Sequence, residues 1–131
     1  MLREQIDGVS GIGGRVPEID TERNLAMYRA LTTAMGEGLI ASAHDCSDGG
    51  LAAAVAECCF GVDAGANIDV SKIMGDCTEI NSWGALFGES LGRILVSVEP
   101  QYCASFEAAM NGHACYSLGN VEAGDQISIS N

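Results

Sequence analysis

The sequence predicts an α+β domain in which helices pack on a mixed β-sheet. Short apolar or alternating runs, typical of strands, are interspersed with longer runs that carry an apolar residue every three or four positions, typical of helices. An octet of polar residues and glycines, 44–51, stands between the first predicted strand and the second predicted helix. The chain has 131 residues, the size of a single domain.

The charge balance of the chain is strongly acidic. Its 18 Asp and Glu residues against 6 Lys and Arg residues give a net charge of -12. Such a field repels nucleic acid and anionic membranes, so we expect neither as a partner. No apolar run reaches the length of a membrane span, and Met1 to Asp7 lack the apolar stretch of a signal peptide. We therefore expect a soluble, cytoplasmic protein.

The six cysteines show no regular spacing and no CxxC pair. Most of them stand in apolar runs, as is typical of reduced cysteines that pack as small hydrophobic residues in cytoplasmic proteins. A zinc site is an alternative, but its ligands would lack the spacing of zinc motifs. The candidates for such a site are His44, Cys46, Cys77 and His113.

The amino-terminal part begins with a predicted loop. Residues 1–17 hold four glycines and end at Pro17, so we expect a connecting loop there and the domain over residues 18–131. Asp20 or Thr21 is expected to cap a first helix. Its apolar residues recur at spacings of three and four, namely Leu25, Tyr28, Leu31 and Met35.

The octet 44–51 is predicted to be a strand-to-helix junction. The apolar run Leu39–Ala43 before it suits a buried strand, and the alanine-rich sequence after it favours a helix over about 49–60. Ser47 or Asp48 is the natural N-cap of that helix.

Two glycines at the junction suggest an anion site. Gly49 and Gly50 leave backbone N–H groups open to a ligand at the positive end of the helix dipole. The side chains around them are two carboxylates, an imidazole and a hydroxyl, which suits a phosphorylated ligand, with or without a metal ion. The alternative is a capped turn whose glycines only permit tight packing.

A second predicted strand follows the junction helix. Ala66–Val70 alternates apolar and polar residues, so strand, helix and strand form a βαβ-like unit. The junction would lie at the carboxyl end of its first strand, where open sheets often bind ligands. Residues 71–85 give little signal. We expect Ile73 and Met74 to pack, and Trp83 to be a core or interface anchor.

The loop Leu86–Arg93 is the second polar motif, and it enters a clear strand, Ile94–Val98. Two of its glycines bracket a carboxylate, a hydroxyl and an arginine. Such a loop can present Ser90 and backbone amides to phosphate oxygens, while Arg93 supplies a bidentate donor. The alternative is a polar turn in which Arg93 pairs with Glu89.

The carboxy-terminal part is predicted to hold one helix and two strands. Pro100 suits the first turn of the helix, which Asn111 and Gly112 end. Its apolar residues are Tyr102, Phe106 and Met110. Residues 116–121 and 126–130 then look like two strands around a turn.

Five segments in this order carry a family resemblance: Gly14–Asp20, Asn24–Leu31, Ser42–Leu51, Leu86–Arg93 and Leu118–Val121. From about residue 14 to 121 the chain resembles the carboxy-terminal domain of the synthetase subunit of phosphoribosylformylglycinamidine synthase, in the aminoimidazole-ribonucleotide (AIR) synthetase-like superfamily. The His-Asp-x-Ser-Asp-Gly-Gly-Leu and Gly-Glu-Ser-x-Gly-Arg motifs are specific to the superfamily. The Val-Pro-Glu-Ile-Asp lead-in favours this member over selenophosphate synthetase, hydrogenase-maturation and thiamine-phosphate kinase relatives.

The resemblance implies a part of an ATP-dependent ligase of purine biosynthesis. ATP would phosphorylate the amide oxygen of formylglycinamide ribonucleotide, with Mg²⁺ bridging phosphates and carboxylates. Ammonia from a glutaminase subunit would then displace the phosphate to give the amidine. The implied partners are the amino-terminal nucleotide domains of the synthetase, the glutaminase subunit and a small bridging subunit.

The resemblance also implies a role in binding substrate or nucleotide phosphate for nine residues, without naming a general base or a metal ligand. They are His44, Asp45, Ser47, Asp48, Gly49, Gly50, Glu89, Ser90 and Arg93. The Asp-rich nucleotide motif of the family and the strand expected before residues 1–17 are missing. We therefore expect an AIR synthetase C-terminal-domain-like fold without its first strand, inactive on its own. The alternatives are a non-catalytic assembly module, or the same domain of a selenophosphate synthetase or thiamine-phosphate kinase type of enzyme.

Overall fold

The computed structural model describes residues 19–75 and 82–131 and confirms an α+β fold. The predicted loop at 1–17 and Cys77 lie outside the described residues. In chain order the elements are α2 (Thr21–Gly36), β1 (Ser42–Asp45), α3 (Gly50–Cys59), β2 (Ala64–Asp69), α4 (Ser71–Gly75), α5 (Ser82–Phe87), β3 (Ile94–Ser97), a 3₁₀ turn (Pro100–Tyr102), α6 (Cys103–Ala109), β4 (Gly119–Ala123) and β5 (Ile127–Ser130). No helix among the described residues combines the length and the apolarity needed to cross a membrane.

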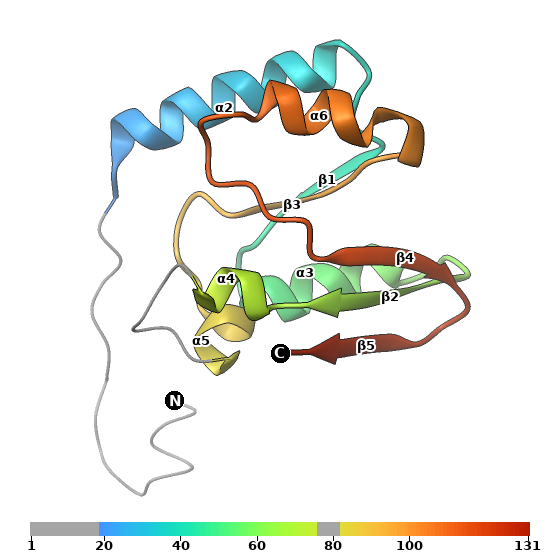
Figure 1. Ribbon diagram of the computed structural model, residues 1–131. Helices are drawn as coiled ribbons and strands as arrows, with labels where there is room; N and C mark the ends of the chain where they lie inside the picture. The colour runs from blue at the N-terminus through green and yellow to red at the C-terminus, as the bar shows by residue number, and fades with distance from the viewer. Residues whose placement is uncertain (1–18, 76–81) are drawn as a thin grey trace, which may run out of the picture.

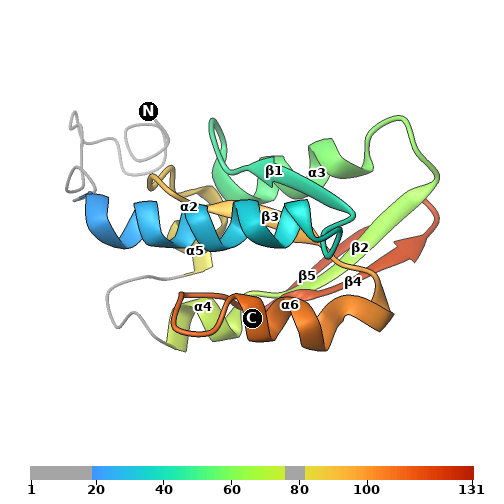
Figure 2. The same cartoon turned by 90° about the horizontal axis from the view of Figure 1, so that it is seen from above.

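Helices α2 and α6 form a layer on one side of the molecule (Figure 1). Seen from above, the two helices run side by side, and β3 lies beneath α2 (Figure 2). The predicted cap of α2 is confirmed, because the Asp20 side chain accepts a hydrogen bond from the Arg23 backbone N–H at 3.0 Å. The buried contacts of this layer come from Leu31, Ala34, Phe106 and Met110.

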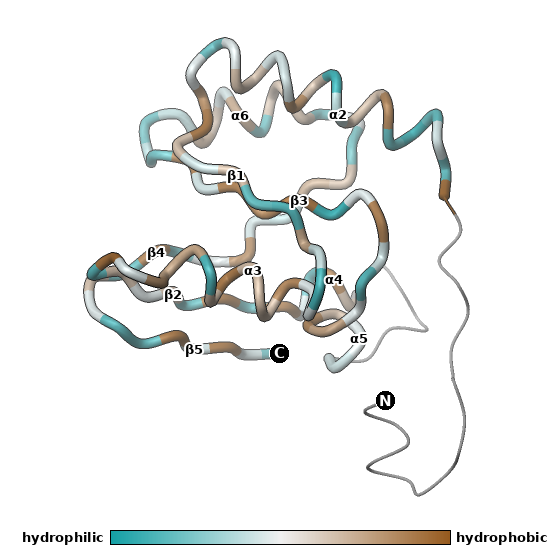
Figure 3. The backbone as a smooth tube through the Cα atoms, turned by 180° about the vertical axis from the view of Figure 1, so that it is seen from behind, coloured by the Kyte–Doolittle hydropathy of each residue, from teal (hydrophilic) through white to brown (hydrophobic). Residues whose placement is uncertain are grey.

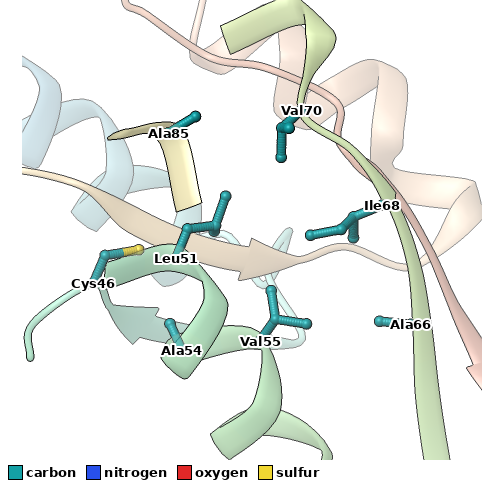
Figure 4. Close-up of a cluster of buried hydrophobic side chains, with 8 residues drawn as sticks. All are labelled: Cys46, Leu51, Ala54, Val55, Ala66, Ile68, Val70 and Ala85. Atoms are coloured by element: carbon teal, nitrogen blue, oxygen red, sulfur yellow. The ribbon is translucent and has the colours of Figure 1, made fainter. Parts of the chain in front are cut away.

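The second layer is built on α3 and β2. Residues at positions 51, 54 and 55 share one face of α3, and they meet the inward side chains of β2. Figure 4 shows this cluster, which consists of Cys46, Leu51, Ala54, Val55, Ala66, Ile68, Val70 and Ala85. Ile73 and Met74 pack against it from α4, as predicted.

The strands form two small sheets, and this corrects the predicted βαβ unit. Strand β1 pairs only with β3, antiparallel, with His44 opposite Leu95. Strand β2 is the centre of the other sheet, antiparallel to β4 and parallel to β5. Strands β1 and β2 therefore do not share a sheet. Helix α3 instead connects two different sheets. The local sequence pattern cannot distinguish this arrangement from a βαβ unit within one sheet.

The last two strands also pair differently from a simple hairpin. Strand β2 lies between β4 and β5, because the turn after β4 carries the chain across to the other edge of β2. The apolar and polar residues of β5 alternate (Figure 3). Both strands are edges of this sheet and are exposed along their length, while the inward side chains of β2 between them pack on α3.

Two local predictions need correction. The first strand runs from Ser42 to Asp45 and is mostly exposed, while Leu39 and Ile40 before it pack on the α2–α6 cluster. Of the two roles predicted for Trp83, that of a core residue is wrong, because 67% of its surface is exposed, and that of an interface anchor stays a prediction. Trp83 stacks on Phe87 of the same helix, with ring centroids 5.6 Å apart.

Candidate functional site

The junction between β1 and α3 begins with two polar residues of the strand. His44 lies between two acceptors: its Nδ1 is 2.7 Å from the Asp45 carbonyl oxygen, and its Nε2 is 3.1 Å from a carboxylate oxygen of Glu57 on α3. Ser47 donates its hydroxyl hydrogen bond to the Asp45 carboxylate. This bond holds the pKa of Asp45 below its ordinary value, because it favours the charged form.

The N-cap of α3 is Gly49, so the prediction of Ser47 or Asp48 at this position is wrong. Gly49 has a φ of 78°, a left-handed conformation that glycine adopts without strain. Asp48 is exposed, and no side chain of the junction itself caps the helix. Ser47, which could have capped the helix, donates its hydroxyl hydrogen bond to the Asp45 carboxylate instead.

Gly50 confirms the tight-packing alternative at its own position. A Cβ there would lie 2.7 Å from the Gly88 carbonyl oxygen and 2.8 Å from that of Leu86, both too close for a real contact. Its φ of 65° is again left-handed. The junction therefore touches the backbone of the arginine loop directly.

The backbone amides predicted to face an anion already have partners. The Gly49 N–H donates to Oε1 of Glu89 at 3.0 Å, and the Gly50 N–H donates to the Ser47 carbonyl oxygen at 3.0 Å. A carboxylate of the protein itself thus lies where the sequence predicts a bound phosphate. An incoming phosphate would have to displace Glu89 or bind beside it.

The Arg93 side chain hydrogen-bonds to backbone carbonyls rather than to Glu89. Its Nη1 donates to the Gly88 carbonyl oxygen at 2.9 Å, and its Nη2 donates to the Ala85 carbonyl oxygen at 2.7 Å. No ion pair joins it to Glu89 within the described residues, so the predicted alternative of a paired polar turn is wrong. The remaining loop residue of the prediction, Ser90, is half-buried.

The two sequence motifs nevertheless lie together. Glu89 reaches the junction amide, and the Arg93 carbonyl oxygen accepts a 3.0 Å hydrogen bond from the Cys46 N–H. Burial raises the pKa of the Cys46 thiol beneath this contact. Sequence reasoning missed Glu57 as the partner of His44 and the carbonyls of Ala85 and Gly88. No sequence pattern marks them, because their roles come from the packing of α3 and α5.

A hollow of about 210 Å³ lies on the far end of the arginine loop, away from Gly49. It is lined by Asp20, Arg23, Asn24, Met27, Leu91, Gly92, His113 and Ala114. The loop therefore contributes to this hollow through Leu91 and Gly92, while neither Gly49 nor Arg93 lines it.

The side chains that could bind a metal ion are dispersed over the described part of the chain. Within residues 19–75 and 82–131, no three His, Cys, Asp or Glu side chains gather as a possible metal group. The five cysteines in these ranges are free.

These elements define an α+β domain in which α3, with its glycine-rich start, connects two small sheets, β1-β3 and β4-β2-β5, distinct from the doubly wound type that a βαβ unit would build. The model of the family "AIR synthase related protein, C-terminal domain" matches residues 1–130, and the chain belongs to this family.

Three curated relatives share the name phosphoribosylformylglycinamidine synthase subunit PurL. The protein from an Anaeromyxobacter species is 40% identical over an alignment of 124 positions that covers 88% of this chain and 16% of that protein. The Prochlorococcus marinus protein is 36% identical and covers 84% of this chain and 13% of its own length. The Thermobifida fusca protein is 42% identical, and the match covers 70% of this chain and 11% of that protein. The chain thus spans less than a fifth of these relatives.

Solved structures of PurL from T. maritima share the fold. The structure complexed with FGAR superposes with a TM-score of 0.76 at 20% identity, and the match covers 92% of this chain and 20% of that one. The structure complexed with ATP gives a TM-score of 0.63 at 21% identity, with 79% and 18% covered. At these identities the likeness establishes the fold alone.

Proposed function

We propose that this chain is the carboxy-terminal domain of a phosphoribosylformylglycinamidine synthase, the ATP-dependent ligase that converts formylglycinamide ribonucleotide to its amidine. The observation that carries the proposal is the family match over residues 1–130, together with relatives 36% to 42% identical that bear this name. These relatives favour this enzyme over the selenophosphate synthetase and thiamine-phosphate kinase alternatives.

The domain would act as one part of a larger enzyme. ATP would phosphorylate the substrate amide oxygen, and ammonia would then displace the phosphate. The nucleotide domains, a glutaminase subunit and a bridging subunit would supply what this chain lacks, so the chain alone would be inactive. In this proposal the full enzyme uses ATP and is located in the cytoplasm.

The junction and the arginine loop are the proposed contribution of this domain to the phosphate site. Ser47 and Asp48 are exposed beside the start of α3, and the positive end of the helix dipole favours negative charge there. His44, Asp45 and Ser90 belong to the same two segments. Gly50 shapes the site by letting the segments touch.

A second candidate function is a non-catalytic assembly module. The observation that favours it is the exposed apolar group on α5 and the loop after it: Trp83, Phe87 and Leu91 are 67%, 46% and 63% exposed. Exposed apolar groups of this kind mark protein contacts. In this case the domain would hold the synthetase together without touching ATP.

A chimeric synthetase tests both functions. This chain would replace the matching segment of the Prochlorococcus marinus relative, and amidation of formylglycinamide ribonucleotide would be measured with ATP and ammonia. The proposal predicts an active chimera in which Asp48→Asn raises the KM for ATP or for the ribonucleotide, because the Asp48 carboxylate would reach the phosphates through Mg²⁺. Asp63→Asn is the matched control, because Asp63 is exposed in the turn before β2.

The outcomes separate the two candidates. An active chimera with unchanged kinetics in Asp48→Asn, and in Ser47→Ala as well, would leave only the assembly role. A chimera that assembles as a folded protein but has no activity would contradict the proposal of a shared synthetase function.

A further inference from the structure

Helix α3 receives its cap from a distant part of the chain. Its N-cap residue, Gly49, has no side chain, and the first N–H groups of a helix need acceptors. The carboxylate of Glu89, 40 positions further along, accepts the hydrogen bond of the Gly49 N–H. A carboxylate at this end of a helix is also favoured by the helix dipole.

Arg93 holds the segment that carries Glu89. Its two guanidinium hydrogen bonds end on the carbonyls of Ala85 and Gly88, at the end of α5 and directly before Glu89. Carbonyls at a helix end lack partners within the helix, and an arginine there satisfies them with favourable charge. The cost of desolvating the half-buried guanidinium is thereby offset by hydrogen bonds to the protein itself rather than to a ligand.

The backbone of Arg93 closes the arrangement. Its carbonyl oxygen accepts from the Cys46 N–H, three residues before Gly49, while its side chain reaches back to α5. Gly50 rests on the carbonyls of Leu86 and Gly88 between these two contacts. Three separate interactions therefore join the junction to the loop.

We infer that Glu89 and Arg93 are positioning residues: Arg93 fixes the end of α5 so that Glu89 caps Gly49, and together they set the first turn of α3. The positioning itself does not depend on the proposed function. Only its purpose, to shape the phosphate-facing side of the junction, rests on that proposal. In this account neither side chain contacts the phosphate.

Amide hydrogen exchange of the 131-residue chain, followed by NMR, tests the inference without any ligand. Glu89→Ala removes the acceptor, so the Gly49 amide should exchange about fivefold faster, the effect of losing a typical helix cap. Glu89→Gln keeps an Oε1 acceptor and should stay within about twofold of the wild type. This rescue separates the hydrogen bond from a general loss of structure.

Variants at Arg93 test the longer connection. Arg93→Lys keeps the charge but loses the planar fork, so we expect it to raise exchange at Gly49 about as much as Arg93→Gln does. Arg29→Gln is the matched control, because Arg29 is an exposed arginine on α2. If the Arg93 variants fail to fold, the Glu89 pair alone decides the inference.

Two results would overturn the inference. The first is Gly49 exchange unchanged in Glu89→Ala or in folded Arg93→Gln. The second comes from the chimera: Arg93→Lys retaining wild-type ATP affinity while Arg93→Gln loses it would show that Arg93 contacts phosphate by charge. An inactive chimera would remove the proposed function, yet the exchange at Gly49 would still stand as the test of the positioning role.

Discussion

Helices α2 and α3 begin in opposite ways. Asp20 caps α2 through a hydrogen bond to a residue three positions away, so that helix start is complete within its own sequence. Gly49 begins α3 without a side chain, and the helix takes its cap from Glu89, which lies 40 positions later. One helix start is local, and the other depends on the tertiary fold.

The difference has a consequence for the site. A local cap is available as soon as the helix forms, whereas the start of α3 is complete only when the arginine loop is in place. The junction and the loop are therefore one structural unit, although 35 positions separate Ser47 from Ser82, where α5 begins. Removing the Glu89 carboxylate should therefore be felt at the start of α3 and should leave the Asp20 cap of α2 unaffected.

The largest effect is expected for Gly50→Ala. The new Cβ would be forced against two backbone carbonyls at a left-handed φ, which should lower the free energy of unfolding by about 2 to 4 kcal/mol. Gly38→Ala is the control, since Gly38 has a φ of 72° and no atom within 4 Å of its Cβ position. It should cost only the backbone strain, about 1 to 2 kcal/mol. Equal losses in denaturant unfolding would mean that the contact with the loop is unimportant.

Arg93→Gln should have the next largest effect. It removes two charge-assisted hydrogen bonds to the carbonyls of Ala85 and Gly88, and we expect a loss of about 2 kcal/mol, below the fully buried limit because the side chain is only half-buried. Arg29→Gln on the exposed face of α2 should change stability by less than about 0.5 kcal/mol. Urea unfolding of both variants measures the contrast.

Removing the two caps compares the helix starts directly. Asp20→Ala and Glu89→Ala should each cost about 1 kcal/mol. The first should speed amide exchange only in the first turn of α2, whereas the second should do so at the start of α3 and in the loop at 86–93. Exchange changes confined to the loop in Glu89→Ala would show that α3 does not depend on it.

The smallest effect concerns Ser47, the residue predicted to cap α3. Because its hydroxyl bonds to Asp45 instead, Ser47→Ala should leave the start of α3 intact and should raise the pKa of Asp45 toward its ordinary value. Because the pKa of Asp45 is lower in the folded state, its ionisation stabilises the fold at pH values above the unfolded-state pKa of about 4. This stabilisation is lost as the pH falls through the folded-state pKa, and the variant lacks it at every pH. NMR titration of the carboxyl carbon measures the pKa. Asp69, whose pKa is lowered by the backbone N–H of Ser71, should not change.

The local parts of the fold could be predicted from the sequence. Asp20, the helical spacing from Leu25 to Met35, and the β-type runs each depend on neighbours within a few residues. The two motifs of the site could also be found, because their residue types and order are distinctive. The structure brings the two motifs into contact, but neither Gly49 nor Arg93 lines the hollow beside the loop.

The parts that failed are the ones that depend on distant residues. The division of the strands into two sheets, the cap of α3 and the inward direction of Arg93 all depend on how α3 and α5 pack. The core alternative for Trp83 failed because the six-residue helix α5 leaves this side chain exposed. Periodicity specifies an element, and packing specifies what that element meets.

A double-mutant cycle between Glu89 and Arg93 tests the central claim most directly. The free energy of unfolding would be measured for Glu89→Ala, Arg93→Gln and the double variant, with Asp20→Ala and Arg93→Gln as the reference cycle. If Arg93 acts through Glu89, the first pair should show a coupling of about 1 kcal/mol, while the reference pair should add within about 0.5 kcal/mol. Additive losses for Glu89 and Arg93 would contradict the account.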